Sequence, residues 1–214
     1  MNQAPRRALI VIDVQNEYVT GNLQIQYPPV AGSLRQIGRA MDAAHAAGIP
    51  VIVVQQSSPT DWPLFATGSQ GWALHDTVAS RPRDHYLSKL KASAFIGTDL
   101  ADWLSEHQID TLTVIGYMTH NCNDTTIKHA ADRGMQVEFL HDASGSVPYA
   151  NRAGLASAEE IHRVFSVVQQ SNFAAVLSTD EWLECLASGR LPERDNVHSS
   201  HQRALEQLGQ TAAA

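Results

Sequence analysis

Short apolar segments alternate with amphipathic ones along most of this chain. Runs rich in apolar and β-branched residues are typical of strands buried in a parallel sheet, and they cover residues 8–13, 50–54, 111–116 and 135–140. Shorter segments predict further strands at residues 85–90 and 173–177. Helical spacing predicts helices over residues 33–47, 98–107, 121–133 and 157–170. A capping-box pattern at Ser178 and Glu181 opens one more helix, which runs to about Ala187.

Regular alternation of strands and helices predicts the α/β class. We expect a three-layer, doubly wound, Rossmann-like sheet of about six mostly parallel strands with helices on both faces. This domain would span residues 1–187. Residues 188–214 are predicted to form a polar tail, a subunit-contact helix near residues 200–208 with a disordered Ala-rich end. The long segment 55–83 is rich in Ser, Pro, Gly and Trp and has weak periodicity, which is typical of a functional loop such as a lid.

Composition narrows the class of protein. The chain of 214 residues is 43% hydrophobic and 17% charged, which suits one buried core. Its formal net charge of −7 argues against binding to nucleic acid or to an anionic membrane. The apolar run at residues 8–12 is too short for a signal peptide or a membrane span. Cys122 and Cys185 match no zinc or disulfide spacing, so we expect reduced thiols and a cytoplasmic location.

Cys122 lies at the end of a predicted strand–turn–helix junction, residues 116–122. The N-terminus of a helix favours a thiolate, so this position predicts a lowered thiol pKa and a nucleophile. A buried structural thiol is the alternative, and Cys185 fits that interpretation. Ligands bind at the carboxyl ends of parallel strands, and several polar residues fall at or just beyond such ends: Asp13, Gln55, Lys89 and Asp142.

Asp13 and a nearby lysine could complete a nucleophilic site. Asp13 ends the first predicted strand, where it would either cap the following turn or act as a general base beside the thiol. Lys89 and Lys91 are each interpreted as solvated surface residues or as an inward ammonium group. An inward lysine would compensate a buried carboxylate and help to hold a thiolate.

Other residue types point to no bound metal or cofactor. The ten histidines show no metal-ligand spacing, although His120 could approach a pocket at this edge. The chain also lacks a Gly-x-Gly-x-x-Gly motif and a Walker-type loop, so we expect no cofactor. Trp62, Phe65 and Trp72 form an aromatic cluster in the long loop, either as core packing or as a lid over a substrate.

Four segments together resemble the isochorismatase-like cysteine hydrolase family. They are Ile-Asp-Val-Gln-Asn at residues 12–16, Lys-Leu-Lys-Ala-Ser-Ala-Phe at 89–95, the turn at 116–122, and Val-Glu-Phe-Leu-His-Asp-Ala at 137–143. Their order and spacing match the family from about residue 8 to residue 187. The combination is specific, whereas one segment alone would be a weak signal.

The resemblance implies roles for particular residues. It implies an Asp13–Lys89–Cys122 triad, with Lys89 preferred over Lys91 because it lies four residues before Ser93. It also implies a non-proline cis peptide between Tyr117 and Met118, with the N–H groups of Met118 and Cys122 aimed at an oxyanion. The expected substrate-binding residues are Gln15, Asn16, Tyr18, Gln55, Trp62, Phe95, Tyr117 and His120.

The implied activity is hydrolysis of a C–N bond in a small amide, carbamoyl compound or lactam-like ring, through a thioester and without a cofactor. The family resemblance also implies a homodimer or homotetramer. The chain lacks the Asp-x-His metal motif of the nicotinamidase branch, and Asn123 replaces a small apolar residue, making the pocket or the helix start more polar. Vinyl-ether hydrolysis and a non-catalytic binding protein are the alternatives, and the substrate itself stays open.

Overall fold

The structure, a computed structural model that describes residues 4–209, contains a central sheet of six parallel strands. The strands lie in the order β3-β2-β1-β4-β5-β8, and every neighbouring pair is parallel. Their bounds are β1 Arg7–Ile12, β2 Val51–Gln56, β3 His85–Lys89, β4 Thr111–Tyr117, β5 Gln136–Gly145 and β8 Ala175–Leu177. The doubly wound sheet is confirmed. Its order reverses between β1 and β4, which is where ligands bind in open sheets of this kind.

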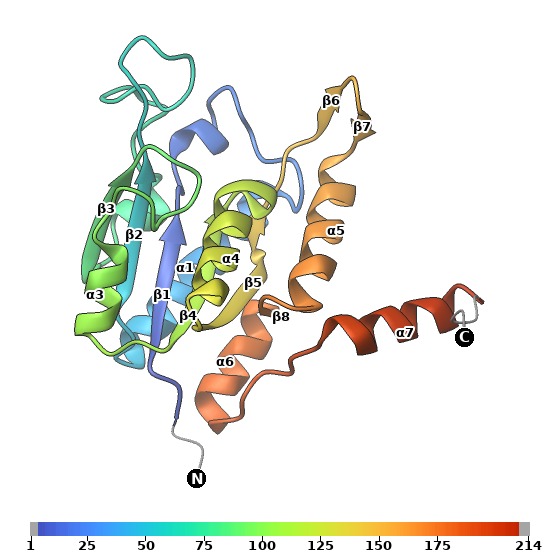
Figure 1. Ribbon diagram of the computed structural model, residues 1–214. Coiled ribbons are helices and arrows are strands. Elements are labelled where there is room, and N and C mark those ends of the chain that lie inside the picture. Colours follow the sequence, from blue (N-terminus) through green and yellow to red (C-terminus); the bar gives the residue numbers. More distant parts are fainter. Residues whose placement is uncertain (1–3, 210–214) are drawn as a thin grey trace.

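Helices cover both faces of the sheet (Figure 1). Alternate residues of β1 point to opposite faces, as the period of a strand requires. Leu9 and Val11 join an apolar cluster with residues of α1 and α6, whereas Ile10 and Ile12 join a second cluster with residues of α3 and α4. The helices are α1 Val30–Ala46, α2 Asp76–Ala79, α3 Leu100–Glu106, α4 Asp124–Asp132, α5 Ala158–Gln170, α6 Thr179–Ser188 and α7 Val197–Gln207.

Several elements differ from the sequence-based prediction. The strand predicted to end at Leu140 continues to Gly145, because Ser144 and Gly145 pair with β4 beyond a register shift. Polar residues at 141 and 142 hide that continuation from an apolar pattern. A hairpin of β6 (Tyr149–Asn151) and β7 (Gly154–Ala156) is absent from the prediction, because each strand is only three residues long. The hairpin and the long loop after β2 both lie at the carboxyl end of the sheet (Figure 1).

The last helix, α7, extends away from the domain (Figure 1). None of the residues of α7 is buried. The segment between α6 and α7 is attached to the sheet by Arg194, whose Nη2 donates to the carbonyl of Val137 at 2.7 Å. The predicted disordered end, residues 210–214, lies outside the described residues.

Gly116 lets β4 approach β1 closely at the point where the sheet order reverses. Its φ is +103°, and a Cβ placed there would lie 2.1 Å from the carbonyl oxygen of Ile12. Both the conformation and the space therefore require glycine. The residues that follow these two strands, Asp13 and the turn to Cys122, depend on this contact for their separation.

We expect Gly116→Ala to lower the free energy of unfolding by about 2 kcal/mol or more, because the methyl group meets backbone rather than a movable side chain. Urea unfolding followed by circular dichroism measures the loss. Gly48 is the matched control, since it also has positive φ but a Cβ added to it would have no atom within 4 Å. Gly48→Ala should lower the free energy of unfolding by only about 1 kcal/mol, because it introduces the strain of the left-handed conformation alone. Equal losses in the two variants would contradict the steric explanation.

Candidate active site

Asp13, Lys89 and Cys122 meet at the carboxyl edge of the sheet. Lys89 Nζ lies 2.7 Å from Asp13 Oδ2, and both side chains are 0% exposed. The same ammonium group donates to Cys122 Sγ at 3.3 Å. Asp13 and Cys122 also interact with each other, since each shifts the pKa of the other. The structure therefore brings together the three residues of the expected triad.

Local backbone geometry turns these side chains toward one another. Asp13 would continue the side of β1 that carries Leu9 and Val11, but its φ of +54° breaks the alternation just after the strand ends. Aspartate tolerates this left-handed conformation better than most residues. On β3, Leu87 and Lys89 are buried on the same side of the strand. Lys91 would share that side if β3 continued, but the strand ends at Lys89 and Lys91 is exposed.

The turn before Cys122 has an irregular backbone. The expected cis peptide between Tyr117 and Met118 is present. A single π-helical turn, Thr119–Asn123, then leads into α4, and the N–H groups of Asn121 and Asn123 both donate to the carbonyl of Met118. Turns of this type occur frequently at functional sites. The thiol of Cys122 thus lies inside the π turn rather than at a regular helix start.

Burial controls the electrostatics of this cluster, and it overturns one expectation. Burial, reinforced by the Asp13 carboxylate, raises the pKa of the Cys122 thiol, so the predicted lowering by a helix N-terminus is wrong. Burial also raises the pKa of Asp13, although Lys89 opposes it. For Lys89, burial acts to lower the pKa, but the charges of Asp13 and Cys122 outweigh it and the pKa is raised. These directions favour a protonated thiol beside the Asp13–Lys89 pair.

Gln56 is a member of the site that the sequence analysis missed. Its Oε1 accepts from Lys89 Nζ at 2.7 Å, which gives the ammonium group a third partner. The expected residue, Gln55, instead donates to the carbonyl of Trp72 and accepts from the hydroxyl of Tyr86. Alternation along β2 could have separated the two glutamines. Gln56 shares its side of the strand with Ile52 and Val54, which belong to the same apolar cluster as Cys122.

Two tyrosines interact electrostatically with the Cys122 thiol, and one of them packs against His120. Burial raises the pKa of Tyr18 well above its ordinary value, with further contributions from Cys122 and Asp13. Tyr149, in the unpredicted hairpin, has its pKa raised by burial and by Cys122. The ring of His120 packs edge-on against Tyr149 with a centroid distance of 5.1 Å, and its Nδ1 lies 3.1 Å from Ser146 Oγ. Tyr18 and His120 were among the expected substrate-binding residues, whereas Tyr149 was not.

Four of the other expected substrate-binding residues pack in the core or hold the long loop, and a fifth is exposed to solvent. Tyr117 is fully buried in the cluster that includes α1, and its hydroxyl lies 2.7 Å from Ser33 Oγ. Phe95 packs against His129 of α4. Gln15 and Asn16 hold the long loop through bonds to the carbonyls of residues 56, 70 and 72. Trp62 is 58% exposed in that loop.

The polar residue Asn123 acts on the helix start. Its Nδ2 donates to the carbonyl of Gly116 at 2.8 Å and to Ser144 Oγ at 2.9 Å. This fully buried side chain thus joins the two ends of the Gly116–Asn123 turn to each other and its last residue to β5. Of the two roles expected for this residue, the structure shows the one at the helix start.

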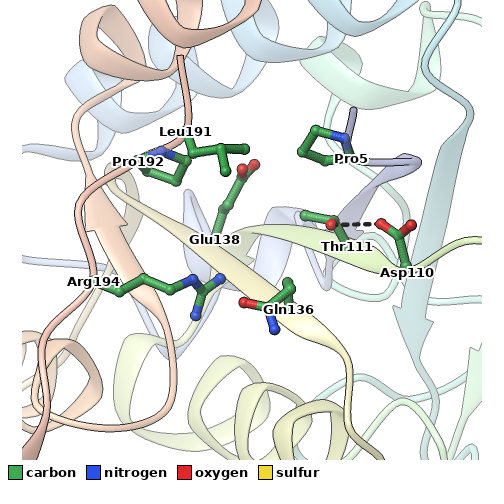
Figure 2. Close-up of a pocket in the computed structure, with 8 residues that line it drawn as sticks. All are labelled: Pro5, Asp110, Thr111, Gln136, Glu138, Leu191, Pro192 and Arg194. Carbon is green, nitrogen blue, oxygen red and sulfur yellow. Dashed lines mark hydrogen bonds between the residues drawn. The ribbon is translucent and has the colours of Figure 1, made fainter. Parts of the chain in front are cut away.

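Outside the triad, the described part of the chain offers other hollows but no evident metal site. A cavity of about 360 Å³ lies at the opposite, amino-terminal edge of the sheet (Figure 2). Its buried carboxylate, Glu138, is already paired with Arg7 and accepts from Thr113 and Trp182. Within residues 4–209, no group of three or more His, Cys, Asp or Glu side chains is arranged to hold a metal ion. None of the helices in that range combines the length and the apolar character that spanning a membrane requires.

Comparison with known proteins shows the family. Residues 7–181 match the isochorismatase domain, so the chain belongs to the isochorismatase family of hydrolases, which act on small molecules. The crystal structure of an isochorismatase-family protein from Burkholderia xenovorans LB400 is 62% identical, covers 97% of this chain and 100% of that one, and superposes with a TM-score of 0.95.

Two curated relatives carry named activities. Ureidoacrylate amidohydrolase from Methylorubrum extorquens is 29% identical, and the match covers 83% of this chain and 85% of the relative. Streptothricin hydrolase from Streptomyces noursei is 30% identical, over 71% of this chain and 59% of the relative. The expected family resemblance is therefore confirmed, and one of these two relatives is named an amidohydrolase.

Folding stability should depend on pH through His162, a histidine of α5 that is 5% exposed. Burial, with smaller effects from His141 and His120, lowers its pKa from 6.5 to about 4. The unfolded chain then binds the proton more readily than the folded protein. This contribution to stability is complete above a pH of 6.5 and is lost as the pH falls toward about 4.

We expect the free energy of unfolding to fall by at most about 1.4 kcal/mol for each pH unit on account of this one group. Urea unfolding at a series of pH values between neutral and mildly acidic measures the slope. His162→Asn removes the titrating group and should flatten the slope, while carboxylates titrate equally in both proteins. An unchanged slope in the variant would show that the imidazole does not stay neutral in the fold.

Proposed function

We propose that this protein is a cysteine hydrolase that cleaves the C–N bond of a small amide, carbamoyl compound or lactam-like ring through a thioester. One observation carries the proposal: Lys89 Nζ lies within 2.7 Å of Asp13 Oδ2 and 3.3 Å of Cys122 Sγ in a site shielded from solvent. A buried acid, a buried ammonium group and a thiol in contact form the arrangement that nucleophilic catalysis requires.

The first half of the reaction forms the thioester. Asp13 accepts the proton of the Cys122 thiol as Sγ attacks the carbonyl carbon of the substrate. Its raised pKa makes Asp13 a stronger base than an exposed carboxylate. Lys89 keeps the charge of the site balanced while the sulfur becomes negative. The N–H groups of Met118 and Cys122 stabilise the oxyanion. When the C–N bond breaks, Asp13 returns the proton to the departing amine or ammonia.

The second half restores the enzyme. Asp13 takes a proton from a water molecule, which attacks the thioester carbon and produces a second oxyanion at the same N–H groups. The C–S bond then breaks, the acid product leaves, and the proton on Asp13 returns to the sulfur. Tyr18 and Tyr149, whose pKa values the thiol influences, and His120, which packs against Tyr149, would contact the substrate. The loop over residues 55–83 would contribute its outer wall as a lid.

The relatives favour amide hydrolysis over the alternatives. One is named an amidohydrolase and another a hydrolase of streptothricin. Vinyl-ether cleavage needs no nucleophilic thiol, and a binding protein needs neither the base nor the lysine. We also propose a cytoplasmic location, where the two free thiols would stay reduced.

Acylation of Cys122 is the direct test, with 4-nitrophenyl acetate as the probe ester. We expect a burst of nitrophenolate from the wild-type protein and an acetyl group on Cys122, but not on Cys185, by peptide mass spectrometry. Cys122→Ala should abolish the burst. Asp13→Asn keeps a residue that tolerates positive φ but removes the base, and it should slow acylation by about 100-fold or more.

A panel of small amides, scored for released ammonia, extends this test to C–N bonds. Full turnover by Cys122→Ala would end the thioester mechanism. Release of pyruvate from isochorismate by Cys122→Ser would favour the vinyl-ether alternative. Binding of a small ligand without any acylation of Cys122 would favour the alternative of a non-catalytic binding protein.

The C-terminal tail supports a proposal about assembly. We propose that residues 1–187 form the hydrolase domain and that α7 packs on a second copy of the chain, as a dimer or tetramer. A lone helix of this length is marginal in water, and α7 buries none of its residues within the described chain. Val164, Val167 and Val168 form an exposed apolar stripe on α5. Val197 and Leu208, at the two ends of α7, are also exposed apolar residues.

Size-exclusion chromatography with light scattering should give the mass of a dimer or tetramer for the wild-type protein. Val167→Glu places a charge in the exposed stripe and should shift the mass toward the monomer, because a charge at a buried contact is costly. Leu155→Glu, at the exposed tip of the β6–β7 hairpin, is the control and should leave the mass unchanged. A monomeric wild-type protein would contradict this proposal.

A further inference from the structure

A buried hydrogen-bonded chain links α5 to the turn that carries Cys122. His162 Nδ1 lies 2.8 Å from Thr119 Oγ1, which in turn lies 2.8 Å from Ser144 Oγ. Ser144 Oγ accepts from Asn123 Nδ2, whose second bond goes to the carbonyl of Gly116. All four side chains are buried. None of the steps in the proposed reaction uses this chain.

This series of hydrogen bonds restrains the turn that carries Cys122 at three residues. Gly116 is its first residue, Thr119 directly follows Met118, and Asn123 directly follows Cys122. Thr119 and Asn123 are each bonded to Ser144 of β5, and Thr119 also donates to the carbonyl of Gly145 at 3.2 Å. The carbonyl of Gly116 accepts from Asn123 Nδ2. The π-helical turn leaves the backbone here without the regular bonds of an α-helix. Side-chain bonds therefore add to the two backbone bonds at the carbonyl of Met118 in holding the peptide groups of the turn.

His162 supplies the outer anchor of this arrangement. It comes from α5, so it connects the turn to an element outside the β4–β5 pair. Its ring packs against Tyr27 at a centroid distance of 5.5 Å and lies 6.3 Å from that of His141. These contacts restrain the imidazole, and through its bond to Thr119 they restrain the residue next to Met118.

We propose that Thr119 and His162 are positioning residues that aim the backbone N–H groups of the catalytic turn at the oxyanion. This inference rests on the proposed function and deepens it. The three bonds of Lys89, to Asp13, Gln56 and Cys122, involve no member of the buried chain. Formation of the nucleophile and stabilisation of the oxyanion are thus assigned to two separate sets of side chains.

The separation has a measurable consequence. Alkylation of a thiol by iodoacetamide displaces iodide from a saturated carbon and forms no oxyanion. Acylation by 4-nitrophenyl acetate passes through an oxyanion. Loosening the turn should therefore slow acylation while alkylation keeps its rate. A defect in the fold or in the triad would slow both reactions together.

The experiment compares Thr119→Val, which keeps the shape but removes the hydroxyl group, with Thr119→Ser, which keeps the hydroxyl group. Acylation and deacylation both pass through the oxyanion, so we expect Thr119→Val to lower the rate of the nitrophenolate burst and kcat each by about 10- to 100-fold, with KM changed less than about threefold. Thr119→Ser should stay within about threefold of the wild type. The rate of Cys122 alkylation, followed by peptide mass spectrometry, should be unchanged in both variants.

His162 provides a second, independent pair of variants. His162→Leu should reproduce the loss in kcat, and His162→Asn, which keeps a polar group near the position of Nδ1, should rescue it. The double variant Thr119→Val/His162→Leu should be no slower than the slower single variant, because both break the same link. Circular dichroism and urea unfolding identify any variant that fails to fold.

Other outcomes would overturn the inference. Thr119→Val with wild-type kcat would remove the positioning role, as would losses that multiply in the double variant. Equal slowing of alkylation and acylation would assign the residues to the general fold. If the wild-type protein is not acylated at Cys122 at all, the proposed function itself fails, and that result is distinct from all the variant outcomes.

Discussion

The buried ion pair between Asp13 and Lys89 is the constraint on which the rest of the structure depends. Both side chains are withdrawn from water, so each would be costly to bury without the other. The pair needs β1 and β3 to end at matching heights, although β2 lies between them in the sheet. Gln56, at the end of β2, completes the shell of the ammonium group. Three neighbouring strands thus contribute one side chain each to a single charge cluster.

The thiol comes from the other half of the sheet, beyond the point between β1 and β4 where the strand order reverses. Cys122 follows β4, which lies beside β1, and Gly116 sets how closely the two strands approach. A neutral thiol next to an ion pair is a more favourable resting state than a third buried charge. Burial and Asp13 raise the pKa of the thiol for the same reason. In the proposed reaction, the thiol would therefore give up its proton to Asp13 only as Sγ attacks a substrate.

Sequence patterns were sufficient to predict the sheet, because its strands are buried runs with few polar interruptions, as residues 8–12 illustrate. They also placed Asp13 and Cys122 at strand ends, which converge in a parallel sheet, but they left Lys89 and Lys91 as alternatives, and only the family resemblance selected Lys89. Local pattern carries no signal for the short β6–β7 hairpin, and the inward position of Gln56 depends on the phase of β2. The direction of the Cys122 pKa shift was wrong because a sequence shows that a helix follows the cysteine, but not how completely the surrounding elements exclude water.

The side chain of Gln15 uses its whole amide group to join two parts of the molecule. Its Nε2 donates to the carbonyls of Gln56 and Trp72, and its Oε1 accepts from the backbone N–H of Gln56. The long loop is thereby fastened two residues from Asp13, the acid of the candidate site. A change of the long loop that suits a new substrate would also disturb the bonds of Gln15, and with them the backbone beside Asp13. Substrate selectivity and proton transfer would therefore change together in the proposed enzyme.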